Sequence, residues 1–283
     1  MLISMELITA VLSGSVIAAF ILIYKRQKQT PDRQCGRDYP ADTVILHQFP
    51  RGPFAPSMSP FCIKIETFLR MAEIPYQNVH SYTMGPKGKS PWIEYNGETL
   101  GDSEMITSYL VEKCGVNLST GLTEEQRAIG RAFQTLVDER MYWLVLLERW
   151  VFHKSEMSGT LTKLPAILIW HISRKTKNMA YAQGLGRHTQ SEIETLLEKD
   201  LKALSDYLGD NKYFLGEQPR EVDCAVFGQL CQVRYHVPNS VKARTYLQES
   251  LPNLTAYMDR MIVKYWPDWE ECMTNGFAKE ATK

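Results

Sequence analysis

Hydrophobic positions divide the chain into a first part in which strand and helix alternate and a second part that is helical throughout. Residues 43–49 form an apolar run typical of a buried strand, and an amphipathic pattern from Ser59 to Ala72 predicts a helix that ends before Pro75. A second strand at 76–81 is expected to run parallel to the first, because the helix between them supplies the necessary crossover.

The next segment predicts an antiparallel hairpin and a closing helix. The strand-like runs 92–95 and 98–100 flank Asn96-Gly97, the preferred two-residue hairpin turn. Asp102 and Ser103 then cap a helical pattern that Gly115 ends. The resulting β-α-β-β-β-α order predicts a thioredoxin-like α/β domain over residues 43–118.

Strand patterns disappear after this domain. Capping boxes at 123–126 and 189–192 each begin a long amphipathic pattern. Residues 164–171 are apolar but too few to cross a bilayer, so they predict a buried helix or a hydrophobic wall, and the basic residues of 174–177 favour a solvated surface over a second membrane contact. We expect an all-helical domain over 119–274, followed by a tail at 275–283.

The N-terminus departs from this globular pattern. Residues 7–24 are uncharged and nearly as long as the roughly 20 apolar residues that cross a bilayer. A cleaved signal peptide is the alternative, but it normally carries Lys or Arg before its apolar run, whereas Lys25, Arg26 and Lys28 follow this one. We therefore expect residues 1–24 to form a single transmembrane anchor and 25–42 a flexible linker, with the folded body facing the cytoplasm.

Composition and charge exclude several classes of function. The 32 basic residues balance the 32 acidic ones and form no basic stripe, which argues against nucleic-acid binding. The six cysteines include no Cys-x-x-Cys pair, and no two histidines have the spacing His-x-x-x-His. Cys224 and Cys231 share a face of a predicted helix, where a core role is favoured over metal ligation. The sequence therefore predicts no metal site.

The helix start at Ser59 is the main candidate for chemistry. A serine N-cap followed by Pro60 presents its hydroxyl together with free backbone N–H groups, an arrangement that suits a thiolate or another anion. A plain helix cap is the alternative interpretation. Cys62 follows in the first turn, where the helix dipole could lower the pKa of its thiol, although buried packing is the more usual role.

An α/β unit followed by a helical domain resembles the cytosolic glutathione transferases, and the resemblance covers residues 43–269. The motif at 89–93 (KSPWI) is similar to the strand start at which the family has a cis-proline and a backbone that pairs with the cysteinyl group of glutathione. The motif at 101–104 (GDSE) resembles the turn that holds the γ-glutamyl carboxylate. The resemblance implies glutathione as co-substrate, a catalytic residue that stabilises its thiolate (Ser59), and four residues that bind it (Ser90, Pro91, Asp102 and Ser103).

Further motifs are more specific. The segments 47–51, 59–61 and 221–228, with the leading apolar stretch, resemble the failed-axon-connections family, its nematode cadmium-responsive branch and, more distantly, the metaxins. Residues 214–227 resemble the folding motif of the family's helical domain, with Asp223 kept and Arg220 in place of the capping hydroxyl.

This second resemblance implies a membrane-anchored, glutathione S-transferase-like protein that acts in stress response or detoxification of cadmium or electrophiles. The alternative is a non-catalytic, metaxin-like binding or scaffold module at a membrane.

Under the enzymatic interpretation an electrophile would bind against the helical domain, where Tyr142, Trp143, Trp150 and Trp170 are bulky enough to line a pocket but are more readily explained as core. A homodimer or another protein partner is also expected, because relatives are often dimers. Whether the long loop before Ser59 closes the cleft, and whether the chain is an enzyme, stay open at this point.

Overall fold

The computed structural model describes residues 39–283. The predicted anchor, and all of the predicted linker except its last residues, lie outside this range. Within the described part of the chain, no helix is long and apolar enough to cross a membrane.

The first domain is built on a four-stranded sheet in the order β2-β1-β3-β4. Its strands are β1 (Val44–Gln48), β2 (Tyr76–His80), β3 (Trp92–Tyr95) and β4 (Glu98–Gly101). β1 pairs parallel with β2 and antiparallel with β3, and β3 and β4 form the hairpin around Asn96-Gly97. This arrangement confirms the predicted thioredoxin-like fold.

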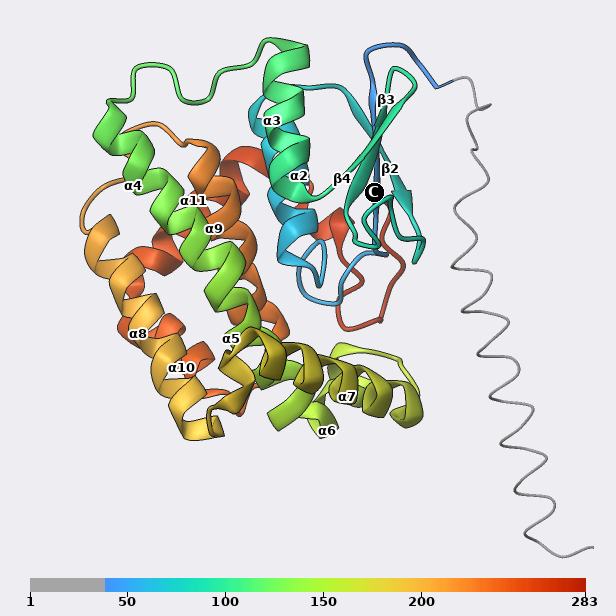
Figure 1. Cartoon of the computed structure of the whole chain (residues 1–283), viewed down its shortest axis with the longest axis vertical. Helices are drawn as coiled ribbons and strands as arrows, with labels where there is room; N and C mark the ends of the chain where they lie inside the picture. Colours follow the sequence, from blue (N-terminus) through green and yellow to red (C-terminus); the bar gives the residue numbers. More distant parts are fainter. Residues whose placement is uncertain (1–38) are drawn as a thin grey trace, which may run out of the picture.

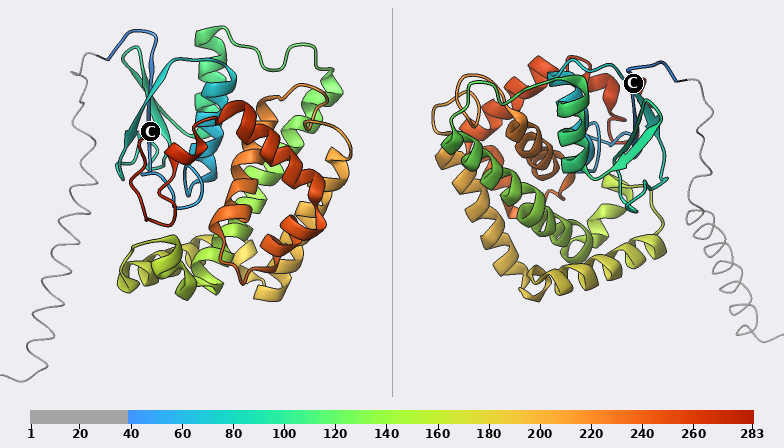
Figure 2. Two further views of the ribbon diagram at one scale, coloured as in Figure 1. Left: turned by 180° about the vertical axis from the view of Figure 1, so that it is seen from behind. Right: turned by 45° about the horizontal axis from the view of Figure 1, so that its top comes forward.

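Two helices, α2 (Pro60–Met71) and α3 (Ser103–Cys114), lie between the sheet and the helical domain (Figure 1 and Figure 2). They bury Phe68 and Leu110 against Leu46 of β1 in one apolar cluster. On the opposite face of β1, His47 stacks on Trp92 with 3.6 Å between ring centroids. The Trp92 indole also donates to the carbonyl of Thr83, so the segment before β3 packs on this second face.

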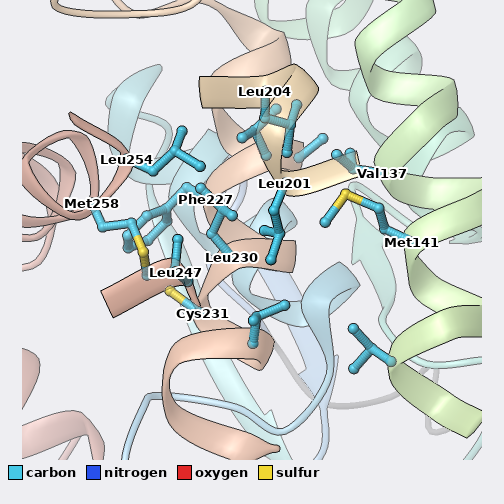
Figure 3. Packing of buried hydrophobic residues seen from close by; sticks show 14 of the residues in the cluster. Val137, Met141, Leu201, Leu204, Phe227, Leu230, Cys231, Leu247, Leu254 and Met258 are labelled. Atoms are coloured by element: carbon cyan, nitrogen blue, oxygen red, sulfur yellow. The ribbon is translucent and has the colours of Figure 1, made fainter. Parts of the chain in front are cut away.

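The second domain is helical, as predicted. Its helices are α4 (Glu124–Thr135), α5 (Tyr142–Leu147), α6 (Lys154–Glu156), α7 (Ala166–Gln183), α8 (Gln190–Leu208), α9 (Glu221–Cys231), α10 (Lys242–Ser250) and α11 (Pro252–Tyr265), with π-helical turns at Leu136–Met141, Glu148–Phe152 and Gln232–His236. Figure 3 shows the centre of its core, where Leu201, Phe227 and Met258 come together from α8, α9 and α11.

The folding motif at the start of α9 keeps one half of its predicted capping box. The carboxylate of Asp223 accepts from the backbone N–H groups of Arg220 at 2.7 Å and Phe214 at 3.0 Å. Arg220 has no hydroxyl for the reciprocal bond. Its guanidinium instead donates to the carbonyls of Leu118 and Thr120, which ties the segment between the domains to α9.

Helix α9 is also the main contact of the helical domain with α2. A Cβ atom on Gly228 would lie 2.5 Å from the carbonyl oxygen of Pro60, so only glycine permits this approach of the two backbones. Beside it, Lys64 of α2 forms an ion pair with Asp138 of the helical domain. The first turn of α2, which follows Ser59, is therefore held in place by the second domain.

Of the two alternatives predicted for the apolar segment 164–171, a buried helix or a hydrophobic wall, the buried helix was wrong. The segment begins α7, and its side chain at Ile169 is buried, but Ile167 is 56% exposed and Trp170 is 46% exposed. Helix α7 lies at the outer edge of the molecule and has neighbours on one side (Figure 1). Its apolar residues therefore could not all be covered.

Candidate functional site

The predicted site residues come from three elements that begin or end at one edge of the sheet. Trp92 at the start of β3 pairs with Gly101 at the end of β4, so Ser90-Pro91 and Asp102-Ser103 are neighbours. The first turns of α2 and α3 lie at the same edge, and both point toward α5, α6 and α7 (Figure 1 and Figure 2).

Ser59 is the N-cap of α2, as predicted. Its Oγ accepts from the backbone N–H of Cys62 at 3.4 Å, and its own N–H donates to the Oγ of Ser57 at 3.2 Å. The Ser59 hydroxyl also faces the buried thiol of Cys62 and can donate to it. Because a hydroxyl rotates to suit its partner, the same proton can turn to an anion at the start of the helix.

Cys62 links Ser59 to the next candidate residue without being reactive itself. Its Sγ lies 3.9 Å from the Oγ of Ser90, which places the start of β3 against the first turn of α2. The thiol is fully buried, and this burial raises its pKa, despite hydrogen bonds from the neighbouring serines. Packing is thus the role that the structure supports, and activation by the helix dipole is not.

The peptide bond between Ser90 and Pro91 is cis, as the resemblance implied. Between residues 39 and 283, no hydrogen bond uses the backbone N–H or C=O of Ser90. Both groups lie ahead of the first ladder pair of β3 at Trp92 and can therefore pair with an extended ligand, in the way that an added strand would.

Asp102 and Ser103 form the start of α3. One carboxylate oxygen of Asp102 accepts from the N–H groups of Glu104 at 3.2 Å and Met105 at 3.5 Å. The N–H and hydroxyl of Ser103 take no part in hydrogen bonds with the described residues. Lys89 lies 3.7 Å from Asp102 and its side chain is exposed, so a positive charge stands beside these free donors. A bound carboxylate could accept hydrogen bonds from Ser103 and lie near the positive charge of Lys89 at this position.

The loop before Ser59 is held by two buried residues that the sequence did not indicate. Arg149 donates to the carbonyl of Met58 at 3.0 Å, and Gln232 donates to the carbonyl of Ser57 at 3.1 Å. Arg149 also donates to Gln232 at 3.2 Å. Burial lowers the pKa of Arg149 to about 10. No local pattern could have identified this pair, because it acts over 91 and 175 positions along the chain.

The same loop carries Arg51, which forms a buried ion pair with Glu66 of α2. The guanidinium donates to both carboxylate oxygens at 2.7 and 2.9 Å, and Gln48 and Asn78 donate at 2.7 and 3.0 Å. Burial by itself would raise the pKa of Glu66, but the hydrogen bonds and charge of Arg51, with the charge of Arg70, lower it to about 2.

Residues 274–283 pack onto this loop from the other side. The N–H groups of Thr274 and Gly276 donate to the carbonyls of Gly52 and Pro53 at 3.0 and 2.9 Å. Arg51 Nε donates to the carbonyl of Lys283 at 2.8 Å. The long loop is therefore fixed between the last segment and the helical domain.

One aromatic residue of the helical domain reaches the site. The Tyr142 ring lies 5.0 Å from that of Phe61, directly after Ser59 and Pro60, and both are half-buried. Trp170, for which a core role was favoured, is instead exposed at the outer edge. An apolar group bound beside Ser59 would contact the Phe61–Tyr142 pair.

Two hollows lie away from these residues. One, of about 710 Å³, is lined by Pro50, His80, Lys163 and the last segment, and the other, of about 240 Å³, lies between α3, α4 and the start of α9. Neither is lined by Ser59, Ser90 or Ser103. The case for a ligand at the sheet edge therefore rests on free hydrogen-bonding groups and not on an enclosed cavity.

Comparison with known proteins agrees with this geometry. The glutathione S-transferase N-terminal domain matches residues 60–157, and the glutathione S-transferase C-terminal domain matches residues 197–261. The chain is 32% identical to failed axon connections of Drosophila melanogaster over 84% of its own length and 61% of that protein. It belongs to the glutathione S-transferase-like family. The predicted family is thereby confirmed.

The chain also resembles a bacterial glutathione S-transferase, a metaxin and a solved structure. It is 28% identical to isoprene-epoxide–glutathione S-transferase of Rhodococcus sp. strain AD45, over 74% of the chain and 94% of that protein. It is 26% identical to metaxin-2 of Mus musculus, over 82% of the chain and 91% of that protein. Among solved structures, β-etherase LigF from Sphingobium sp. strain SYK-6 covers 83% of the chain and matches over 98% of its own length, with a TM-score of 0.57 and 18% identity. That structural likeness shows the fold alone.

Proposed function

We propose that this chain binds glutathione across the starts of α2, β3 and α3, and presents its thiolate to an electrophile. The observation that carries the proposal is the set of hydrogen-bonding groups that a ligand can use at one edge of the sheet: the Ser59 hydroxyl, which can turn away from the Cys62 thiol, the unpaired Ser90 backbone, and the unpaired N–H and hydroxyl of Ser103. Their order follows an extended tripeptide, with the cysteinyl thiol beside Ser59, the cysteinyl backbone beside Ser90 and the γ-glutamyl carboxylate at Ser103, near Lys89.

The chemistry assigned to Ser59 is stabilisation of the thiolate. Its hydroxyl donates a hydrogen bond to sulfur, which lowers the thiol pKa and raises the fraction of nucleophile at neutral pH. The sulfur electron pair then forms a bond to the electrophilic carbon. The leaving group, or the oxygen of an opened epoxide, takes the electron pair from the broken bond and a proton from water. The relative named for isoprene epoxide supports a small electrophile as second substrate.

The biological setting completes the proposal. Residues 1–24 anchor the body to a membrane and leave residues 43–283 facing the cytoplasm, where glutathione is available. There the protein acts in stress response or detoxification, against electrophiles or through the glutathione that cadmium consumes. The apolar stretch 7–24 and the basic residues after it support this placement.

Glutathione binding is tested with the full chain purified in a mild detergent. Isothermal titration measures binding, and conjugation of a broad aromatic electrophile measures turnover. A hydrogen bond to a charged group contributes about 1.5–3 kcal/mol, so Ser59→Ala is expected to lower kcat/KM by about 10- to 150-fold. Ser250→Ala, at the exposed end of α10, is the control and should change neither quantity. Full turnover by Ser59→Ala would remove Ser59 from its role.

A non-catalytic binding module is the second candidate, and one surface favours it. Helix α7 exposes Ile167, Trp170, Met179 and Tyr181, and the chain is similar to metaxin-2. Such a surface suits a second copy of the chain or another protein. Light scattering of the full chain and of Trp170→Ser tests this candidate. Loss of self-association in the variant, together with no glutathione binding by the parent protein, would favour the module over the enzyme.

The anchor is tested in cells that express the full chain. Carbonate extraction should leave the protein in the membrane pellet, and a variant that lacks residues 1–24 should be released. Protease added to sealed membranes from the cytoplasmic side should digest the folded body. Release of the intact full chain by carbonate would exclude a spanning helix.

A further inference from the structure

We propose that Glu148, His153 and Glu194 form a binding site for a divalent cation of the Zn²⁺ type. Glu148 begins the π-helical turn that follows α5, His153 comes directly after that turn, and Glu194 lies in the second turn of α8. They play no part in the glutathione proposal. No sequence spacing indicated them, because the nearest pair is five residues apart and the third comes from another helix.

The geometry is close to that of a three-ligand site. One possible ligand atom from each residue lies within 4.8 Å of the other two. The Nε2 of His153 lies 3.2 Å from a carboxylate oxygen of Glu148. Zinc binds nitrogen and oxygen ligands at about 2.0–2.2 Å, which at a tetrahedral angle sets pairs of ligand atoms about 3.3–3.6 Å apart. Side-chain movements of roughly 1–1.5 Å would therefore close the site around a cation.

The second observation is the state of Glu148. Its side chain is fully buried, and neither carboxylate oxygen has a hydrogen-bond partner among the described residues. His153 Nε2, at 3.2 Å, is an ion-pair partner for Glu148 only when the imidazole is protonated. With neutral His153 the buried carboxylate has no donor, which is unfavourable and requires either a proton or a cation. The carboxylate of Glu194 faces the same point, so two carboxylates lie close together without a cation between them. A divalent cation would offset the burial of Glu148 and the repulsion between the two carboxylates together.

The surroundings of His153 direct one ring nitrogen into the site. Its Nδ1 lies 3.2 Å from the carboxylate of Glu156 and 3.0 Å from the hydroxyl of Ser240, which itself donates to Glu156 at 2.6 Å. A proton on Nδ1 shared with Glu156 leaves the lone pair on Nε2, on the side of Glu148. This carboxylate–histidine arrangement is the one that orients histidine ligands in zinc proteins.

Two further polar groups complete the site. The side-chain amide of Gln190 lies 3.1 Å from both His153 Nε2 and Glu194, so a turn of the amide brings its oxygen toward the cation as a fourth ligand. Lys242 donates to the other oxygen of Glu194 at 2.7 Å and competes for that carboxylate. Its side chain is 69% exposed and can move into solvent when a cation binds.

The donor set selects the class of cation. Two carboxylates and one imidazole suit Zn²⁺ and its neighbours in the first transition series. Mg²⁺ prefers six oxygen ligands, and soft cations prefer thiolates, which this site lacks. We therefore expect Zn²⁺ to bind and Mg²⁺ at the same concentration not to bind.

The test uses the full chain in detergent, stripped with a chelator and free of glutathione. Equilibrium dialysis against Zn²⁺ should give one bound equivalent per chain, with a rise in the thermal unfolding midpoint. Glu148→Gln and His153→Ala should each weaken binding by about 100-fold, whereas His188→Ala, which removes an exposed histidine, should leave it unchanged. Circular dichroism checks that each variant is folded.

Co²⁺ in place of Zn²⁺ provides a readout that needs no variant. Oxygen and nitrogen ligands should give visible d–d absorption without the near-ultraviolet charge-transfer band of a cobalt–thiolate bond. Failure of the parent protein to bind Zn²⁺, a thiolate band with Co²⁺, or equal affinity in Glu148→Gln would each overturn the proposal.

Discussion

At the scale of single residues, the candidate site depends on which polar groups are already paired. Ser59 and Ser103 stand at helix starts and can offer donors to a ligand, whereas Glu66, about two turns further along α2, has both carboxylate oxygens paired with internal partners. The difference follows from position. The helix starts face the sheet edge, and Glu66 faces a buried cluster with Arg51.

The Arg51–Glu66 pair predicts a loss of stability in acid. The pKa of Glu66 is about 2 in the folded chain and near its usual value of 4.5 when unfolded, so its contribution is complete above about pH 5. That contribution, up to about 3 kcal/mol, is lost as the pH falls from about 4 toward 2. Urea unfolding measured between pH 7 and pH 3 should show the decrease.

A variant at Glu66 separates its contribution to stability in acid from those of the other carboxylates. Glu66→Gln leaves the Arg51 guanidinium buried without its counter-charge, which costs about 3–5 kcal/mol at pH 7. The difference in free energy of unfolding between Glu66→Gln and the parent protein should become smaller below pH 4. Glu249→Gln, on the exposed face of α10, should follow the parent protein at every pH. A constant difference in free energy of unfolding between pH 7 and pH 3 would show that the pKa of Glu66 is the same in the folded and unfolded chains.

At the scale of elements, the sequence predicted each strand and helix of the α/β domain to within about two residues. Local signals were strong there, because the residues of the Asn-Gly turn, of the Ser-Pro helix start and of the caps at Asp102 and Thr123 each favour the observed backbone conformation for a chemical reason. The family motifs also located Ser59, Ser90 and Ser103 correctly with respect to these elements. Whether these three bind glutathione is a separate question, which the proposed titration addresses.

What the sequence could not predict was contact between elements that are distant in the chain. Arg149 and Gln232 hold the loop before Ser59, yet each lies in an ordinary helical pattern. The cluster of Glu148, His153 and Glu194 arises only when α5 packs on α8. The segment 164–171 was misjudged for the same reason, since hydrophobicity gives no information on how many neighbours a helix will have.

The crossing of α2 and α9 predicts a specific effect of one methyl group. In Gly228→Ala the new Cβ would meet backbone atoms of Pro60 and Lys64 at 2.5 and 3.2 Å, so the helices must separate. Overpacking of this kind costs about 1–3 kcal/mol, and it would also displace the first turn of α2. Chemical denaturation should show the loss, and glutathione titration should show weaker binding.

Another helical glycine provides the control. At Gly130 in α4 an added Cβ meets the tip of the Leu215 side chain at 3.1 Å, which can rotate away. Alanine there gains helix propensity of about 0.5–1 kcal/mol, so Gly130→Ala should be neutral or slightly stabilising. Equal stability of the two variants would mean that the α2–α9 approach is not tight.

At the scale of the whole molecule, the last segment links the two domains through the loop before Ser59. It donates to Gly52 and Pro53, accepts from Arg51, and places Phe277 5.0 Å from the ammonium group of Lys163. Removal of residues 274–283 should therefore free the loop. We expect a loss of about 2 kcal/mol or more from the three hydrogen bonds, with faster proteolysis between residues 50 and 58.

Calorimetry and limited proteolysis measure these two effects. Glu280→Ala lies in the same segment, is exposed, and leaves all three hydrogen bonds in place, so it should behave as the parent protein does. An unchanged cleavage rate after truncation would show that the helical domain alone fixes the loop.

The bond between Arg51 and Lys283 also sets an order in time during synthesis. Its partners are 232 positions apart, so at about 5–20 residues per second a ribosome needs roughly 10–50 s to add the second after the first. Throughout that interval the loop before Ser59 lacks this bond and depends on Arg149 and Gln232 of the helical domain, once they have been translated. The domain that is translated first thus gains its last contact only after residue 283 has been added.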